Sequence, residues 1–221
     1  EGLVEPILIG DPEKVRAALQ ESGETGVSLQ VVNPYNPALL QHNAAEYMSI
    51  QKGKGKDISE EEAIKAVKDP LAAGALMVRR GEAEIGVAGN LSSTADVIRA
   101  GLRMVGTAAG SKTVSSFFFM LKDNNVCMFT DCAVIPEPTS AQLADIAIST
   151  AGVYKRVMGD EARVALLSFS TKGSAKHERV DKVRAALEEI KTREPNLLVD
   201  GELQLDAAVE PEVARLKAPG S

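Results

Sequence analysis

Short apolar runs alternate along this chain with longer segments that open on helix-start signals, and this order constrains the fold more than any other feature. The first apolar run, residues 6–10, is followed by Asp11 and Pro12, a turn that puts proline at the first helical position. Further along, Ser59 and Glu62 have the spacing of a capping box. Strands that alternate with helices in this way form mainly parallel sheets with helices on their faces. The order therefore predicts an α/β fold.

The predicted elements extend along the whole chain. Strands are expected at residues 6–10, 29–32, 83–89, 113–121, 126–131, 163–168 and 197–200. Helices are expected at residues 13–22, after the capping box, at 71–80, after residue 89, and at 139–158, 178–194 and 203–216. A polar loop is expected around residues 33–37. Residues 122–125 are turn-prone, so the strands on either side can only pair antiparallel. This change of direction places the predicted boundary between two partial α/β domains, residues 1–122 and 123–221.

Composition argues against several classes of function. The formal net charge of −6 disfavours nucleic acid as a general partner. No apolar run reaches the length of a membrane span. Cys127 and Cys132 lack a metal-binding spacing, the two histidines lie far away in sequence, and an offset of five on one strand does not suit a disulfide. We therefore expect reduced, packed thiols, no bound metal and a cytosolic protein.

Three loops follow predicted strands at the edge of the sheet where α/β proteins bind ligands. The first, residues 89–96, offers the hydroxyl groups of Ser92, Ser93 and Thr94 together with the free amide groups of a helix start. Arg99 is spaced to fold back over the same anion. Backbone donors and one guanidinium suit a phosphate or an acyl phosphate. The alternative is an ordinary Ser/Thr helix cap with a surface arginine, and the residues alone leave both open.

The other two loops are less specific. Residues 168–174 are rich in hydroxyl groups and glycine, as phosphate-binding loops are, but they lack the Walker spacing, so a ligand site and a plain loop both stay open. In the third loop, Asp200 or Glu202 is a candidate general base or metal ligand, or else an acidic residue of a helix cap. Ser115 and Ser116 precede three phenylalanines, so at least one of them is expected near the core, bonded to a neighbouring loop or to a ligand. Neither a hydrolase triad order nor a dinucleotide fingerprint occurs in the sequence.

Several of these segments together resemble the phosphate acetyltransferase (phosphotransacetylase) family in order and in approximate spacing. They are residues 69–70, 89–99, 110–118, 131–139 with 142–144, 168–174, 200–208 and 217–221. Residues 90–94 and 200–204 are most similar to the branch of the family used in ethanolamine utilisation. The resemblance implies a three-layer, two-domain fold like that of isocitrate and isopropylmalate dehydrogenases, incomplete in this chain, with the active site in the cleft between domains.

The resemblance also implies the reaction of acetyl-CoA with phosphate to give acetyl phosphate and CoA. It implies that Arg99 contacts the phosphate group as the catalytic residue, and that coenzyme A is a substrate, so that no further cofactor is expected. The expected substrate-binding residues are Asn90, Ser92, Ser93, Thr94, Ser115, Ser116, Ser170, Thr171, Gly173 and Ser174. We expect a homodimer in the cytoplasm or in a microcompartment, with small-molecule substrates and no nucleic-acid or membrane partner.

The chain also departs from the family pattern. Family members begin with a strand–helix unit that is absent before Glu1, and they continue past residues 217–221 into a segment with an Asp-Leu-Ser-Arg motif and an aspartate that bind CoA and deprotonate its thiol. An arginine expected near Lys52 is also missing. We therefore expect a chain that is truncated at both ends and inactive on its own. The open alternatives are a phosphate butyryltransferase and a non-catalytic acetyl-CoA-sensing domain like that of bacterial malic enzymes. A dehydrogenase of the same fold is unsupported, because no nicotinamide or metal constellation is found.

Overall fold

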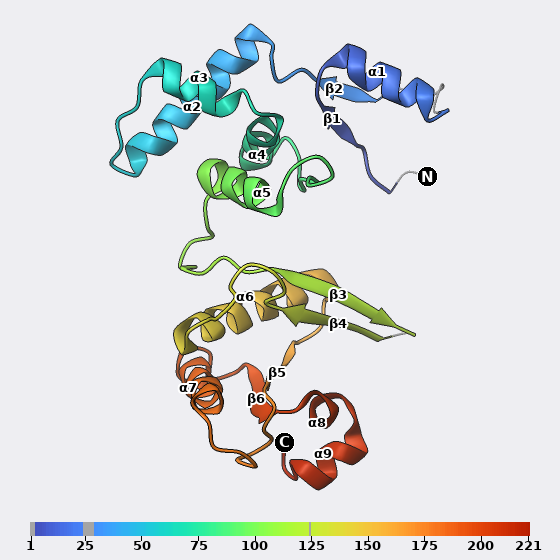
Figure 1. The fold of residues 1–221 in the computed structure, drawn as a ribbon, viewed down its shortest axis with the longest axis vertical. Coiled ribbons are helices and arrows are strands. Elements are labelled where there is room, and N and C mark those ends of the chain that lie inside the picture. Colours follow the sequence, from blue (N-terminus) through green and yellow to red (C-terminus); the bar gives the residue numbers. More distant parts are fainter. Residues whose placement is uncertain (1–2, 24–28, 124) are drawn as a thin grey trace. The chain divides into compact units, whose positions relative to one another are not determined.

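The computed structural model describes residues 3–23, 29–123 and 125–221. The chain divides into two compact units, Glu1–Gly106 and Thr107–Ser221, and each has its own core (Figure 1). The sequence placed its domain boundary after residue 122 instead. The difference arises because the strand before that point pairs with the strand after it, so the two strands belong to one unit.

The first unit begins with a parallel strand pair joined by a helix, as the sequence predicts. Strand β1 (Ile7–Ile9) pairs in parallel with β2 (Gln30–Val32), and α1 (Pro12–Glu21) lies between them in the chain. The side chain of Asp11 caps α1 by accepting hydrogen bonds from the amides of Glu13 and Lys14.

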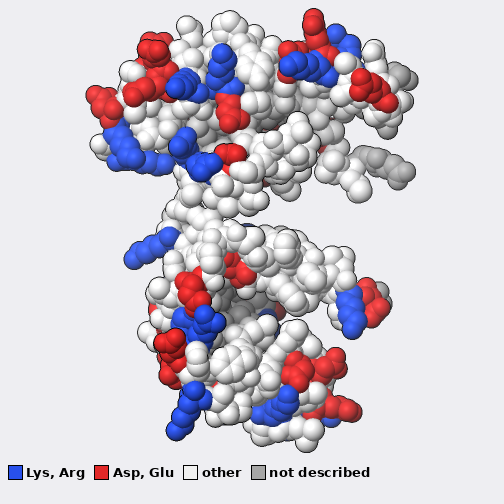
Figure 2. All heavy atoms as spheres, viewed as in Figure 1, with Lys and Arg blue, Asp and Glu red and all other residues white. Residues whose placement is uncertain are grey.

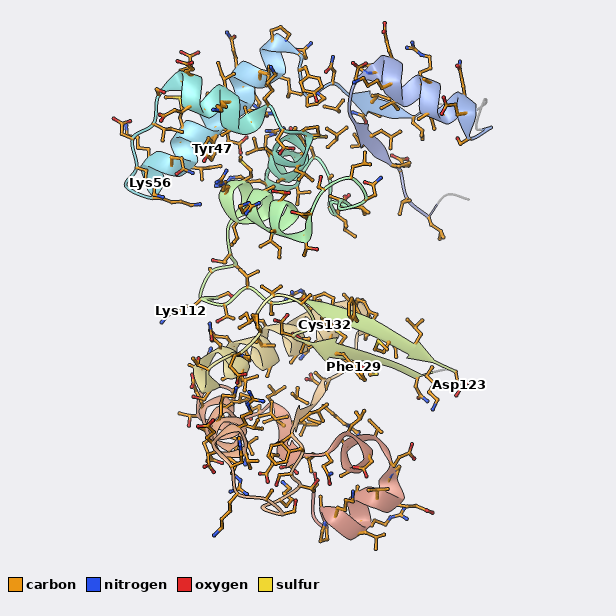
Figure 3. All side chains as sticks on the ribbon, viewed as in Figure 1. Tyr47, Lys56, Lys112, Asp123, Phe129 and Cys132 are labelled. Atoms are coloured by element: carbon orange, nitrogen blue, oxygen red, sulfur yellow. The ribbon has the colours of Figure 1, made fainter. Side chains whose placement is uncertain are left out.

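Three helices build the core of the first unit. They are α2 (Pro37–Gly53), α3 (Glu60–Val67) and α4 (Pro70–Arg80). Both bonds of the capping box between Ser59 and Glu62 are present, and Gly81 ends α4 in the left-handed conformation. Buried residues of the three helices and of the segment after them form one cluster: Ala44, Tyr47, Ala63, Val67, Ala72, Leu76 and Met104. Figure 3 labels Tyr47 on α2 and Lys56 in the loop that follows.

Helix α2 corrects the prediction of a polar loop around residues 33–37. The side chain of Asn36 accepts hydrogen bonds from the amides of Ala38 and Leu39, and Pro37 occupies the first helical position. Asn-Pro is thus a helix start here and not a turn within a loop. The helix ends at Gly53, within a segment rich in lysine at residues 52–56.

The prediction of a buried strand at residues 83–89 is wrong. The structure shows no strand there, and Ile85 and Val87 are 78% and 96% exposed. A strand needs a neighbour that pairs with its backbone, and the sheet assigned in this unit consists of β1 and β2. The helix expected after residue 89 is present as α5 (Thr94–Ala100), and it continues into a π-helix, η1 (Gly101–Val105).

A long antiparallel hairpin opens the second unit, as predicted from its short turn. Strand β3 (Phe117–Lys122) pairs with β4 (Asn125–Thr130). Every residue of β3 is exposed, although the strand is strongly apolar. Uncharged atoms cover the hairpin in Figure 2, and charges gather at its tip, where Figure 3 labels Asp123. Cys127 on β4 is exposed and free, and so the expectation of packed thiols fails at this position; Cys132 is free and partly buried.

The remainder of the second unit is a helix-covered parallel strand pair. Strand β5 (Arg163–Leu167) pairs in parallel with β6 (Leu198–Leu203), and α6 (Ser140–Met158) packs with α7 (Glu178–Arg193) against them. The single helix expected at residues 203–216 is instead two, α8 (Leu205–Val209) and α9 (Pro211–Lys217). Glu210 is extended because the following proline disfavours a helical conformation at the residue before it. Within the described residues, no helix is long and apolar enough to cross a membrane.

Candidate functional site

The loop before α5 contains the predicted phosphate-facing residues, and it is closed by a small hydrogen-bonded cluster. Ser93 caps the helix: its Oγ accepts from the amide of Asp96 at 3.2 Å and donates to Asp96 Oδ2 at 2.6 Å. The Arg99 guanidinium reaches back over this first turn and donates to Asp96 Oδ1 at 2.5 Å. Arg99 therefore lies over the helix start, where its present partner is a carboxylate.

This ion pair is exposed, with 57% of the Arg99 side chain and 48% of the Asp96 side chain accessible. Hydrogen bonds from Ser93 and Arg99 lower the pKa of Asp96, so the carboxylate is charged at neutral pH. Exposed pairs of this kind contribute little to stability. A multiply charged anion can therefore replace Asp96 as the partner of Arg99 at a small cost in free energy.

Three other predicted residues surround this cluster without using their side chains in it. Asn90 and Thr94 are exposed and Ser92 is partly buried. Their side chains make no hydrogen bond to other residues that the structure describes, so they remain available to a ligand.

Ser115 and Ser116 differ sharply although they are neighbours. Ser116 Oγ donates to Asp131 Oδ1 at 2.6 Å and accepts from the amides of Cys132 and Ala133 at 3.1 and 2.9 Å. A hydroxyl has one donor and two acceptor sites, so Ser116 is fully used inside the chain. Ser115 is partly buried and makes no side-chain hydrogen bond within the described part of the chain. Ser115 is thus the serine that stays free for a ligand.

Asp131 completes this second cluster. It accepts hydrogen bonds from the amides of Ser116, Val134 and Ile135 in addition to the Ser116 hydroxyl. Burial on its own raises the pKa of Asp131, but these donors outweigh it and lower the pKa from 3.8 to about 2. The charged carboxylate therefore holds the turn after β4 in place.

The loop at residues 168–174 bends around a carboxylate that belongs to the chain itself. Ser170 Oγ and the amide of Gly173 both donate to Glu202 Oε1, at 2.9 and 2.7 Å. Arg184 on α7 donates to both carboxylate oxygens, at 2.8 and 3.2 Å. Ser170 is 0% exposed and Glu202 is 1% exposed. The loop surrounds an anion, and that anion is the carboxylate of Glu202.

The remaining hydroxyl groups of this loop also have partners inside the chain. Thr171 Oγ1 donates to Gln204 Oε1 and accepts from the amide of Gln204, at 3.2 and 2.9 Å. Ser174 Oγ accepts from the amide of Thr171 at 3.0 Å. Ser174 and Gly173 are nevertheless exposed. Of the four residues predicted in this loop, Ser170 and Thr171 face inward, and the other two reach the surface.

The comparisons with known proteins point in one direction. A family model described as phosphate acetyl/butaryl transferase matches residues 1–221. The chain belongs to this family. It is 43% identical over 227 residues to the phosphate acetyltransferase of Thermoanaerobacterium thermosaccharolyticum, covering all of this chain and 68% of the relative. It is 38% identical over 221 residues to that of Salmonella typhimurium, covering 30% of that longer relative.

Solved structures of the same family are similar along the whole chain. A phosphotransacetylase from Streptococcus pyogenes matches with a TM-score of 0.87 and 38% identity, and covers 100% of this chain and 66% of its own. The EutD phosphotransacetylase from Staphylococcus aureus matches with a TM-score of 0.86 and 35% identity, with 100% and 67% covered. The predicted α/β fold and the predicted family are confirmed. This chain spans about two thirds of the length of these phosphotransacetylases.

The comparisons also weigh the alternatives that the sequence left open. Relatives that match the whole chain at 38–43% identity are named phosphate acetyltransferase, so the acyltransferase class is confirmed and the butyryltransferase alternative is not favoured. The roles of individual residues in this chain stay predictions. Arg99 and its loop lie in one unit, and the two serines and the loop at residues 168–174 lie in the other.

Two carboxylates organise the candidate site in a way that the sequence did not predict. Asp131 was not singled out as a site residue, and Glu202 was a candidate general base, metal ligand or cap. Neither carboxylate belongs to a possible metal cluster in the described residues. The sequence did contain one signal for Glu202. It comes two residues after the predicted strand at residues 197–200, and a charged side chain that becomes buried at a strand end needs a partner that compensates its charge. Arg184, on α7, the helix that precedes β6 in the chain, supplies that partner, although 43% of its own side chain is exposed.

Proposed function

We propose that the full-length protein is a phosphate acetyltransferase that moves an acetyl group between coenzyme A and inorganic phosphate. The observation that carries the proposal is the match to phosphate acetyltransferases along all 221 residues at about 40% identity. Coenzyme A enters as a substrate, and the chemistry needs no further cofactor.

The proposed reaction is a direct acyl transfer. The CoA thiolate attacks the carbonyl carbon of acetyl phosphate, a C–S bond forms, the C–O bond to phosphate breaks, and phosphate leaves with the bonding electron pair. The reverse reaction makes acetyl phosphate. Negative charge grows on the phosphate as it leaves, so a cation held beside it stabilises the transition state more than the ground state.

Arg99 is the residue we assign to this task. Its guanidinium already holds an anionic carboxylate over the start of α5, and that partner is exposed and weakly bound. Asn90 and Ser92 lie in the same loop and Thr94 begins α5. Their side chains, like that of Ser115, make no hydrogen bond to other residues that the structure describes. A fixed donor of this kind contributes about 3 kcal/mol to transition-state stabilisation.

We further propose a cytoplasmic homodimer without a membrane or nucleic-acid partner. The net charge of −6 supports the absence of a nucleic-acid partner. The likeness to a protein named EutD supports a place in ethanolamine utilisation, and with it association with a microcompartment.

The proposal is tested by supplying the full-length protein with phosphate and either acetyl-CoA or butyryl-CoA, and measuring release of CoA and formation of the acyl phosphate. Acetyl phosphate should form, with kcat/KM for acetyl-CoA at least about tenfold above that for butyryl-CoA, because a pocket closed around a methyl group excludes two further methylenes. A preference for butyryl-CoA would support the butyryltransferase. Binding of acetyl-CoA without any acyl phosphate would support the sensing domain.

A further inference from the structure

Glu202 is a buried charged residue that takes no direct part in the acyl transfer proposed above. It lies on β6, within the segment that pairs with β5, and its side chain is 2% exposed. Its carboxylate accepts four hydrogen bonds: from Ser170 Oγ, from the Gly173 amide, and two from Arg184. Such a carboxylate can accept about four bonds, so none of its capacity is left for a substrate.

The same residue also holds the backbone of the loop. The amide of Lys172 donates to the backbone oxygen of Glu202 at 3.1 Å. Lys172 has a φ of 48° and Gly173 a φ of 88°, so two consecutive residues are in the left-handed region. Lysine is not favoured in that region and stays there only when its surroundings require it. The amides of Lys172 and Gly173 both donate to Glu202, and these bonds hold this shape together with those between Thr171 and Ser174.

The shape decides what the loop presents to its surroundings. Lys172, Gly173 and Ser174 are exposed at the outer side of the turn, whereas Ser170 and Thr171 face inward. The Lys172 ammonium pairs with Asp200 and approaches the carbonyl oxygen of Gly201. Glu202, buried beneath the turn, therefore holds Lys172 and Ser174 in their exposed positions.

We propose that Glu202 is a positioning residue of the acyl-transfer site: its Oε1 atom, as acceptor for Ser170 and Gly173, fixes the loop that presents Lys172 and Ser174 to substrate. The inference rests on the proposed function and deepens it. The essential feature is the acceptor at Oε1, and the ion pair with Arg184 serves to keep that acceptor in place. Glu202 is buried but 43% of the Arg184 side chain is exposed, so removing both charges together leaves no buried charge without a partner. The acceptor and the ion pair can therefore be separated by substitution.

The test compares two double variants of the full-length protein. Glu202→Gln with Arg184→Met removes both charges but keeps an oxygen that accepts from Ser170 and Gly173. Glu202→Leu with Arg184→Met removes the charges and the acceptor together. We expect the first to keep kcat/KM for acetyl phosphate formation within about threefold of the wild type, and the second to lose about thirtyfold, because misplacing a binding group by about 1 Å costs up to a hundredfold. Equal rates in the two variants would overturn the proposal.

A second readout does not depend on activity. The Gly173 amide donates to Glu202, so its hydrogen exchange should stay slow in the glutamine variant and become about a hundredfold faster in the leucine variant. Unchanged protection in the leucine variant would refute the positioning role even if the wild type made no acetyl phosphate. The wild-type rate alone decides the proposed function.

Ser170→Ala covers the case in which the leucine variant does not fold. Ser170 is fully buried, so a change in turnover reports the shape of the loop and not a lost surface contact. The substitution removes the hydrogen bond from Ser170 Oγ to Glu202 and its contacts with the Ala175 amide and the Ser174 hydroxyl. We expect a loss of kcat/KM of about fivefold to tenfold. A rate equal to that of the wild type would count against the proposal.

Discussion

Ser116→Ala tests whether the second cluster is structural. The substitution removes three hydrogen bonds of the hydroxyl group: the one to the Asp131 carboxylate and those from the amides of Cys132 and Ala133. Each such bond contributes about 0.5–1.5 kcal/mol net, and a bond to a charged group contributes more. Water can replace part of this, because Ser116 and Cys132 are only partly buried. We expect the free energy of unfolding to fall by about 2–3 kcal/mol.

The matched control is Ser115→Ala. Ser115 makes no side-chain hydrogen bond in the described part of the chain, so its loss should change the free energy of unfolding by less than about 0.5 kcal/mol. Urea unfolding of the full-length variants, followed by circular dichroism, measures both changes. Equal stability of the two variants would refute the assignment of Ser116 to the fold. Since Ser115 is the free serine, its substitution should instead raise KM for a substrate.

Two further predictions concern stability. The pKa values of Asp131 and Glu202 are lowered to about 2 in the folded protein. Their contribution to the free energy of unfolding is therefore fully present above about pH 4.5 and is lost as the pH falls toward 2. Urea unfolding should show a lower free energy of unfolding at pH 3 than at pH 6, and equal values would contradict these pKa values. Gly201→Ala places a methyl group 2.8 Å from Leu166 Cβ and should lower the free energy of unfolding by about 1–3 kcal/mol. In the control, Gly53→Ala, the new methyl group meets nothing within 4 Å and should not destabilise the protein. Thermal unfolding compares the two variants, and similar melting temperatures would refute the clash.

The sequence predicted those elements whose signals are local. Helix starts at Asp11 and Ser59 were recognisable because the capping side chain and the first turn lie next to each other in the chain. The antiparallel hairpin was predictable for the same reason, since a short turn leaves only one way to pair the flanking strands. The family resemblance added the fold and the reaction, which the local signals alone do not give.

The failures depend on partners that lie far away in the sequence. Residues 83–89 have the composition of a strand, but strand formation is decided by a neighbouring strand and not by composition. The roles of Ser116 and Ser170 depend on Asp131 and Glu202, which follow 15 and 32 residues later. Both serines look like ligand-binding residues when read alone, because a hydroxyl group that holds a turn and one that holds a substrate have the same sequence signal.

The most direct test of the account is the kcat/KM for phosphate of an Arg99→Ala variant of the full-length protein, with Arg103→Ala as control. Arg103 is an exposed arginine on η1, close to Arg99 in the chain, and the substitution removes the same charge. A hydrogen-bonded contact between charged groups contributes about 1.5–3 kcal/mol, so kcat/KM should fall about 10-fold to 100-fold in the Arg99 variant and stay within about twofold in the control. An unchanged kcat/KM for phosphate in Arg99→Ala, or an equal fall in both variants, would contradict the assignment of Arg99 to the phosphate side of the reaction.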